Sequence, residues 1–183
     1  MCIDRQRGVS LVELIIFIVV VGVAVAGVVA ALRLGAATST DPMVHKQALA
    51  IAEALLEEVE LQPFTYCDPN DANAASALST AACTTPEVIG VEGGETRGSI
   101  TTPFDNVSDY HNPVAIAVSG IDGVAIAGLG AYTAVITVTA QDLGGITAAS
   151  AEALLIRVEV SAPAGVTVVL DGYRTRYAPN ALP

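Results

Sequence analysis

The stretch Arg7-Gly8-Val9-Ser10-Leu11-Val12-Glu13-Leu14-Ile15 places a single carboxylate, Glu13, at the start of a long apolar run. No further charged residue follows until Arg33. As a helix, the uncharged residues 14–32 would reach roughly 29 Å, about the thickness of the hydrocarbon core of a bilayer. A carboxylate at the bilayer centre costs on the order of 2.5–3.5 kcal/mol, so Glu13 needs a compensating partner. The sequence therefore predicts a membrane-spanning helix whose edge carboxylate makes a specific contact.

This pattern resembles the N-terminus of the type IV pilin family, which includes the pseudopilins of type II secretion. The resemblance implies that residues 1–8 are a short basic leader, which a prepilin peptidase removes after Gly8 before it N-methylates Val9. Most members of the family carry Phe or Met where this chain has Val9. Glu13 would become the fifth residue of the mature chain and pair with the terminal ammonium of a neighbouring subunit.

Two other interpretations of this N-terminus remain open. A secretory signal peptide has an apolar core of only about 7–15 residues, shorter than the run here, although residues 27–31 or 35–37 offer small-residue cleavage sites. An ordinary single-span anchor is the second alternative. Neither has a use for Glu13. Arg5 and Arg7 precede the span, so they should stay cytoplasmic and direct the rest of the chain outward.

The composition indicates one acidic domain beyond the span. The chain of 183 residues carries a formal net charge of −11, and residues 34–183 suffice for one modest domain. Such a charge repels nucleic acid, so we expect no direct nucleic-acid binding. Trp is absent and only three Phe and five Tyr occur, which predicts a core of aliphatic side chains.

A second helical pattern follows the apolar segment 9–33. Residues 35–40 read as a small, polar break, and Asp41-Pro42 reads as an N-cap followed by proline at the first helical position. Residues 42–62 are predicted to form an amphipathic helix that Gln62-Pro63 ends. The sequence does not decide whether the two helices are continuous. The predicted apolar face consists of Val44, Ala48, Ile51, Ala52, Leu55, Leu56 and Val59, with Glu53, Glu57 and Glu60 on the opposite side.

Residues 63–113 read as a long loop that holds two of the three cysteines. Cys2 would leave with the leader, so Cys67 and Cys83 remain as a pair on the exported side, where oxidation is expected. We predict a disulfide between them, worth roughly 3 kcal/mol for a loop of this length. Free or metal-bound thiols are the alternative.

Strand patterns dominate residues 114–178. In the segment 154–161, apolar side chains alternate with Arg157 and Glu159. The segments 166–170 and 173–177 flank Asp171-Gly172, a turn-type dipeptide. The pattern predicts an antiparallel meander and, with the helices, an α+β fold in which a long N-terminal helix packs on the sheet. The five predicted strand segments are 114–118, 132–140, 154–161, 166–170 and 173–177.

Two further segments resemble the mannose-sensitive haemagglutinin (MSHA) minor pilins of the MshD type. One is Phe104-Asp105-Asn106-Val107-Ser108-Asp109-Tyr110-His111, and the other is Leu170-Asp171-Gly172-Tyr173-Arg174-Thr175-Arg176-Tyr177. Together with the N-terminus they extend the resemblance across the chain and favour a minor pilin over a major one.

The sequence contains no recognisable catalytic motif, so we expect no enzymatic activity and no organic cofactor. The acidic loop around Asp105, Asn106 and Asp109 could supply oxygen ligands to calcium, as some pseudopilins bind calcium in loops. Their spacing does not fit an EF-hand, and the alternative is a turn in which these side chains cap their own backbone.

The expected function is that of a minor type IV pilin-like subunit that helps to initiate or modify a surface pilus. Its expected partners are other pilin subunits, the prepilin peptidase, the assembly platform of the bacterial inner membrane and the lipid bilayer. The protein would wait in that membrane as a single-pass protein and then move to the cell surface. The alternatives are a minor pseudopilin of a type II secretion system and a membrane-anchored binding module that does not polymerise.

Overall fold

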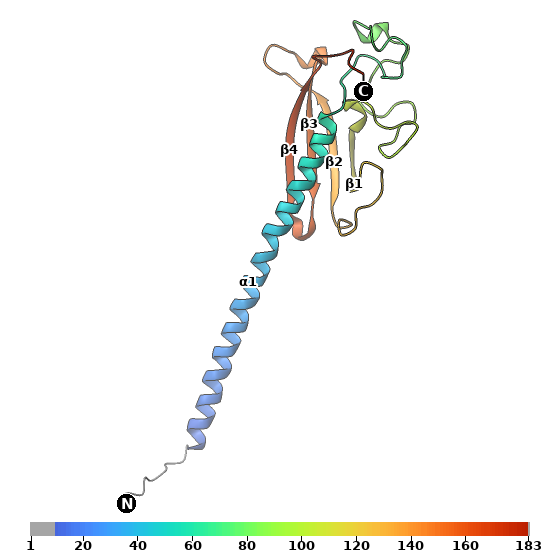
Figure 1. Ribbon diagram of the computed structural model, residues 1–183. Coiled ribbons are helices and arrows are strands. Elements are labelled where there is room, and N and C mark those ends of the chain that lie inside the picture. The colour runs from blue at the N-terminus through green and yellow to red at the C-terminus, as the bar shows by residue number, and fades with distance from the viewer. Residues whose placement is uncertain (1–9, 183) are drawn as a thin grey trace, which may run out of the picture. The chain divides into compact units, whose positions relative to one another are not determined.

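Helix α1 (Leu11–Glu60) is the first element, and a four-stranded antiparallel sheet follows it in the chain (Figure 1). The structure is a computed structural model that describes residues 10–182, without the side chains of residues 34–41. The predicted leader, residues 1–8, therefore lies outside the described residues. The chain divides into one unit up to Met43 and another from Val44 onwards. The predicted α+β class is confirmed.

Helix α1 contains Pro42, so the predicted break at 35–40 and the predicted N-cap at Asp41 are both wrong. A proline inside a helix removes one hydrogen bond and costs about 3 kcal/mol. The helical hydrogen bonds on both sides of Pro42 outweigh the one that it removes, because helix propagation is cooperative. The helix ends at Glu60, two residues before the predicted end, because Pro63 lacks an N–H group and disfavours a helical backbone at Gln62.

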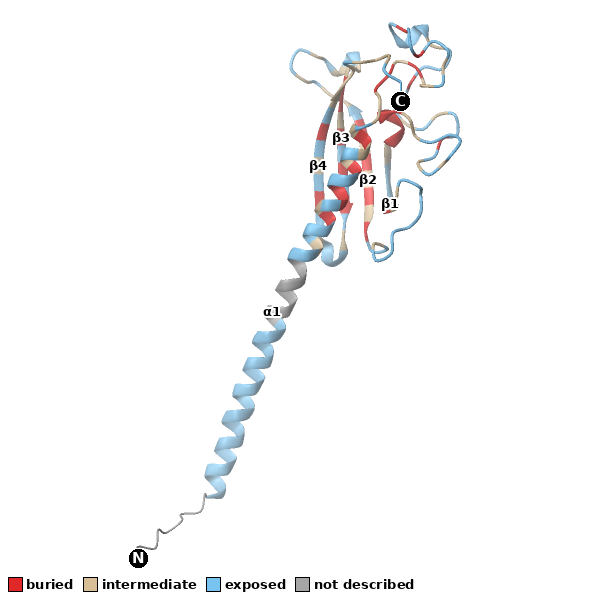
Figure 2. Ribbon diagram, in the orientation of Figure 1, coloured by how far each residue is buried: buried red, intermediate tan, exposed pale blue. Residues whose placement is uncertain are grey.

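The part of α1 from Val44 to Glu60, the packed segment, lies with one face against the sheet (Figure 2). The buried side chains of this face share one core with the sheet, as the helical periodicity predicted. Glu53 and Glu57 are exposed as expected, but Glu60 is half-buried. The core residues from the packed segment are Ala48, Ile51, Ala52, Leu55 and Val59, with Leu49 and Leu56 at its edge.

The sheet is a meander in the order β1-β2-β3-β4, with antiparallel neighbours throughout, as predicted. In β3, Leu154, Ile156, Val158 and Val160 are buried, whereas Arg157 and Glu159 are exposed. This alternation matches the period of two and turns one face of the sheet toward α1. The strands are β1 (Asn112–Ala117), β2 (Thr133–Ala140), β3 (Ala153–Ser161) and β4 (Thr167–Thr175).

Strand β4 runs unbroken through Asp171-Gly172, so the predicted turn at this dipeptide is wrong. The pairing of β4 with β3 continues through both residues, with Asp171 opposite Arg157 and Gly172 opposite Ile156. Asp171 also accepts hydrogen bonds from Arg157 at 2.7 and 2.8 Å at the surface. Gly172 lies beneath α1, where a Cβ would stand only 2.9 Å from Cδ1 of Leu56 and would also meet the carboxylate of Glu60. The glycine therefore permits a close approach of helix and strand.

Residues 61–111 connect α1 to β1 and are called the αβ loop here; they contain two short 3₁₀ helices, η1 (Thr80–Ala82) and η2 (Val107–Tyr110). The loop is attached to α1 at Glu58. Both oxygens of Glu58 accept hydrogen bonds from Arg97 at 2.6 Å, and Oε1 also accepts one from the hydroxyl of Tyr110 at 3.0 Å. This bidentate, largely buried contact fixes the loop on the helix.

Candidate functional site

The first candidate site is the apolar segment of α1, Leu11–Arg33, which is long and apolar enough to cross a membrane by length and composition. None of it is buried within the described structure (Figure 2). Large side chains point outward on every side of the helix; for example, Leu11 is 74 % and Phe17 is 64 % exposed. A helix that is apolar all round requires lipid or other helices to cover it.

Glu13 lies in the first turn of this segment, and its backbone N–H donates to the Ser10 hydroxyl at 3.2 Å. A carboxylate is favourable at this end because the helix dipole is positive there. The side chain itself is exposed, so it is accessible to a cation supplied from outside the chain. Gly8 and Val9, the predicted cleavage and methylation residues, lie outside the described residues.

The second candidate site is the αβ loop, which is closed by the predicted disulfide between Cys67 and Cys83. Their Cα atoms are 5.4 Å apart. Backbone hydrogen bonds from Asp68 to Thr85 and from Glu87 to Tyr66 align the two chain segments beside the bridge. These bonds hold the two ends of the disulfide loop side by side, and Glu87 lies at one of these ends.

Six carboxylates of the αβ loop gather in two groups of three. In each group, one oxygen from every side chain lies within 4.8 Å of the others. The predicted calcium ligands do not form one set, because Asp105 and Asp109 belong to different groups. Asn106 is fully buried; its amide donates to Thr65 at 2.6 Å and its carbonyl accepts from Ser108 at 3.2 Å. The outer group is Asp68, Glu95 and Asp105, and the inner group is Glu87, Glu92 and Asp109.

Asp109 is the most deeply buried of the six, at 1 % exposure. Its Oδ2 accepts the backbone N–H groups of Asp105 at 2.9 Å and Asn106 at 2.7 Å, which caps η2. This is the self-capping turn that the sequence left as an alternative to calcium. Its second oxygen, Oδ1, has no hydrogen-bond partner among residues 10–182. The turn and a ligand role are therefore compatible, since each uses a different oxygen.

Burial and mutual repulsion raise the pKa of these carboxyl groups. Burial, followed by the charge of Asp109, raises the pKa of Glu87 to about 10. The pKa of Glu95 rises to about 8 for the same two reasons. Burial raises that of Asp109 to about 7, although the two backbone N–H groups oppose the rise. At neutral pH the carboxyl groups of Glu87 and Glu95 therefore hold their protons, so the cluster carries less negative charge than six ionised carboxylates would.

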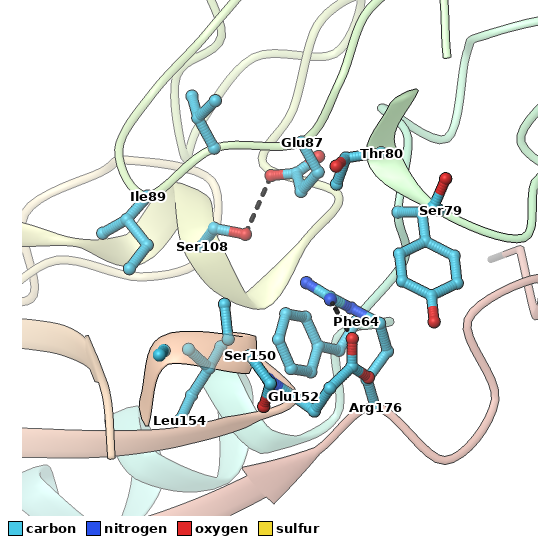
Figure 3. A pocket seen from close by; sticks show the side chains of 14 residues that line it. Phe64, Ser79, Thr80, Glu87, Ile89, Ser108, Ser150, Glu152, Leu154 and Arg176 are labelled. Carbon is cyan, nitrogen blue, oxygen red and sulfur yellow. Dashed lines mark hydrogen bonds and ion pairs between the residues drawn. The ribbon is translucent and has the colours of Figure 1, made fainter. Parts of the chain in front are cut away.

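A cavity of about 670 Å³ lies beside the cluster (Figure 3). On one side, Glu87 accepts a hydrogen bond from Ser108 at 2.8 Å. On the other side, the Arg176 guanidinium lies over the Phe64 ring at 4.0 Å and pairs with Glu152 at 3.0 Å. The size is in the range of small-molecule sites, but the charged groups at its wall already have protein partners.

Sequence reasoning missed several residues of these sites. Glu58, Glu87, Glu92 and Glu95 received no role, and Arg97 was not recognised as an anchor. One signal was present: Glu58 lies three residues after Leu55 and one before Val59, at the border of the apolar face. The other four carboxylates of the cluster follow no regular spacing in the sequence, because a folded loop rather than a helix or strand brings them together. They are Asp68, Glu87, Glu92 and Glu95.

Comparison with known proteins adds one finding at the N-terminus. Residues 3–29 match the family model described as the prokaryotic N-terminal methylation motif. The match includes Gly8, Val9 and Glu13, and it supports a type IV pilin-like or pseudopilin protein with a membrane anchor and a structural role. Neither a curated protein nor a solved structure matched the chain.

Proposed function

We propose that the chain is a minor type IV pilin-like subunit, most similar to the MshD type, that helps to initiate or modify a surface pilus. One observation carries the proposal. The methylation motif coincides with an exposed, apolar helix whose single carboxylate, Glu13, stands in its first turn. A membrane anchor alone has no need of that carboxylate, whereas a subunit that packs against copies of such helices can use it.

In this function, the prepilin peptidase cleaves after Gly8 and methylates the new terminus at Val9. Methylation leaves the amine its positive charge, so Glu13 of one subunit can pair with the terminal ammonium of the next. The pair would form within a bundle of apolar helices, where an unpaired carboxylate is costly. The small residues of the apolar segment allow such helices to approach closely. Glu13 would thus help to set the axial register as the inner-membrane assembly platform moves a subunit from lipid into a filament.

The two segments that resemble MshD-type minor pilins have structural roles in the unit from Val44 onwards, which contains the sheet and is called the sheet-bearing unit here. Phe104 packs edge-on against Tyr110 with ring centroids 5.0 Å apart, and Tyr110 donates to Glu58 on α1. The second segment contains the Gly172 position under α1. Both segments therefore shape the attachment of helix, loop and sheet, as expected for a subunit scaffold.

Two other functions use the same features differently. A minor pseudopilin of a type II secretion system would have the same N-terminal chemistry in another machine. A membrane-anchored module that never polymerises is favoured by the cavity next to Arg176. The pilin and the pseudopilin both require the peptidase and Glu13, whereas the anchored module requires neither. Incorporation into a surface pilus, as opposed to dependence of protein secretion on this chain, separates the pilin from the pseudopilin.

The decisive experiment is the intact mass and N-terminal residue of the membrane-extracted protein, with and without active prepilin peptidase. We expect a chain that starts at methylated Val9 only when the peptidase is active. An uncut N-terminus in both strains would contradict the proposal and favour the anchored module. A cut near Ala31 or Ala37 would indicate an ordinary secreted domain.

Glu13→Ala tests the assembly role separately. We expect the variant to stay in the membrane but to enter filaments at least about tenfold less, because loss of one partner of a buried charge pair costs about 2–5 kcal/mol. The measurement is the ratio of filament-bound to membrane-bound protein. Glu53→Ala is the matched control, since Glu53 is an exposed carboxylate of the packed segment. Equal incorporation of the two variants would contradict the pairing role.

A further inference from the structure

The inner group of the αβ loop brings three carboxyl groups together in a place where water screens their charges poorly. One oxygen from each of Glu87, Glu92 and Asp109 lies within 4.8 Å of the others. Glu87 is 8 % and Asp109 is 1 % exposed. The ion pairs found among residues 10–182 include none of the three side chains. Carboxyl groups that share a site without a cation cannot all ionise at neutral pH, so at least one of them holds a proton.

Hydrogen bonds indicate that this proton lies between Glu87 and Glu92. If both side chains were ionised, neither could donate, and both buried oxygens of Glu92 would lack a partner among the described residues. A proton on Glu87 supplies the donor, and the two side chains then share a hydrogen bond. Asp109 has less need of a proton, because its Oδ2 already accepts two backbone N–H groups, which favour the charged form.

The pKa values of the three groups agree with this assignment. Burial, followed by the charge of Asp109, raises the pKa of Glu87 to about 10. The pKa of Asp109 rises only to about 7, because its two backbone hydrogen bonds oppose the effect of burial. Burial also raises the pKa of Glu92, and the hydrogen bond with Glu87 opposes that rise. Slightly above neutral pH, Glu87 is therefore the member of the inner group that holds the proton.

The basic groups near the inner group are already paired with other carboxylates. Across the cavity, Arg176 follows β4 and pairs with Glu152, which precedes β3, at 3.0 Å (Figure 3). Arg97 of the αβ loop pairs with Glu58 of α1 at 2.6 Å. Ionisation of Glu87 would thus add a charge that these neighbours do not neutralise. The other titratable groups near the inner group are Asp68, Glu95 and Asp105 of the outer group, Tyr110 of η2, and His111, whose Nδ1 accepts the N–H of Val138.

The protonated side chain lies where residues 86–95 are attached to η2. The Ser108 hydroxyl of η2 donates to Glu87 at 2.8 Å (Figure 3), and the Ser108 carbonyl accepts the N–H of Gly90 at 3.1 Å. η2 is itself fixed to α1, because the hydroxyl of Tyr110 donates to a carboxylate of the packed segment. Residues 86–95 therefore depend on the contacts around Glu87 for their position, whereas η2 has a separate attachment.

We propose that the proton shared by Glu87 and Glu92 locks residues 86–95 onto η2, and that loss of this proton in alkaline solution releases them. An ionised Glu87 would repel Glu92 and Asp109 at once, in surroundings of low dielectric constant. Residues 87–89 form part of the cavity wall, so their release would also open the cavity. The αβ loop would then have a closed form in acid and an open form in alkali.

The raised pKa of Glu87 determines the direction of the pH dependence. A carboxyl group with a higher pKa in the closed loop than in the open loop stabilises the closed form fully below its ordinary pKa. That contribution is lost as the pH rises toward about 10. Each proton released on opening raises the opening constant by about tenfold per pH unit in this range. The proposal depends neither on cleavage after Gly8 nor on polymerisation, so its test is independent of the pilin proposal.

The experiment is hydrogen exchange, followed by mass spectrometry, on the full chain in mild detergent between about pH 6 and pH 8. We expect the protection factor of residues 86–95, corrected for the intrinsic rate, to fall by at least about tenfold per pH unit. Residues 153–161 of β3 are the internal reference and should change much less. Glu87→Gln should lower the slope for residues 86–95 by about one factor of ten per pH unit, because glutamine can donate but has no proton to release.

Glu53→Gln is the matched control, since Glu53 is an exposed carboxylate of α1, and it should keep the slope of the unmodified protein. Infrared spectra of the unmodified protein give a measurement that does not depend on the folding of a variant. They should show the C=O band of a protonated carboxyl group at about pH 8. Absence of this band, a protection factor of residues 86–95 that does not change with pH, or equal slopes for Glu87→Gln and Glu53→Gln would each overturn the proposal.

Discussion

Helix α1 contains two segments that both carry many aliphatic side chains but have opposite surroundings. The apolar segment, Leu11–Arg33, is exposed on all sides, whereas the packed segment, residues 44–60, buries one face against the sheet (Figure 2). Leu14 is 53 % exposed in the first and Leu55 is 6 % exposed in the second. The same residue type is therefore left exposed in one segment and packed into the core in the other.

The distribution of polar residues accounts for the difference. In the packed segment, carboxylates alternate with apolar residues at helical spacing, so only one face can leave water. In the apolar segment no face is polar, and the hydrophobic effect cannot be satisfied within the chain. The packed segment is covered by the sheet, whereas the apolar segment needs cover from outside the chain.

The variants Leu55→Ala and Leu14→Ala test most directly whether the two segments contribute differently to stability. Leu55→Ala should lower the free energy of unfolding by about 2–5 kcal/mol, because it removes buried surface and leaves a cavity. Leu14→Ala should leave that free energy unchanged, since the Leu14 side chain is exposed on the helix and the substitution leaves no cavity. Urea unfolding of the full chain in detergent, followed by circular dichroism, measures both. A similar loss for Leu14→Ala would show that the two segments are energetically coupled.

The parts of the fold that follow from periodicity were predictable from the sequence. The apolar run, the buried face of the packed segment and the alternation of β3 all depend on spacings of 3.6 or 2 residues, and all three appear as expected. The antiparallel meander also followed, although the predicted strand segments 166–170 and 173–177 form the single strand β4. The disulfide followed from the two cysteines that remain once Cys2 is assigned to the predicted leader.

The features that the sequence missed depend on tertiary contacts that override local preference. Pro42 signals a helix start, yet long flanking helix carries α1 through it. Asp171-Gly172 signals a turn, yet both residues pair with Arg157 and Ile156 of β3, so β4 continues through them. The acidic cluster joins residues between Asp68 and Asp109 through the folding of the loop, so no local motif could reveal it. 

The ion pair between Arg97 and Glu58 offers a second test, because it gives the packed segment a polar attachment that the apolar segment lacks. Both side chains are only 14 % exposed. Arg97→Gln should lower the free energy of unfolding by about 2 kcal/mol, below the 3–5 kcal/mol of a fully buried pair. Arg157→Gln is the matched control, since its pair with Asp171 is 50 % and 37 % exposed, and it should have no measurable effect. Equal losses would contradict the anchoring role of Glu58.

Glycines in the two units give the finest test of the comparison. Gly172→Ala should lower the free energy of unfolding by about 1–2 kcal/mol, because the new methyl group would collide with Leu56 and Glu60 on the packed segment. Gly22 and Gly27 have nothing within 4 Å of an added Cβ. Gly22→Ala should therefore leave the unfolding free energy unchanged.

The variants Gly22→Ala and Gly172→Ala also distinguish packing within the chain from packing between subunits. If small residues of the apolar segment serve close helix contacts in a filament, Gly22→Ala should reduce incorporation into filaments while the sheet-bearing unit keeps its stability. Gly172→Ala should show the reverse pattern, with lower stability and normal incorporation of the folded fraction. Filament yield and urea unfolding, measured on both variants, decide between these outcomes. Parallel changes in both measurements would mean that the two segments do not divide the roles of core and interface between them.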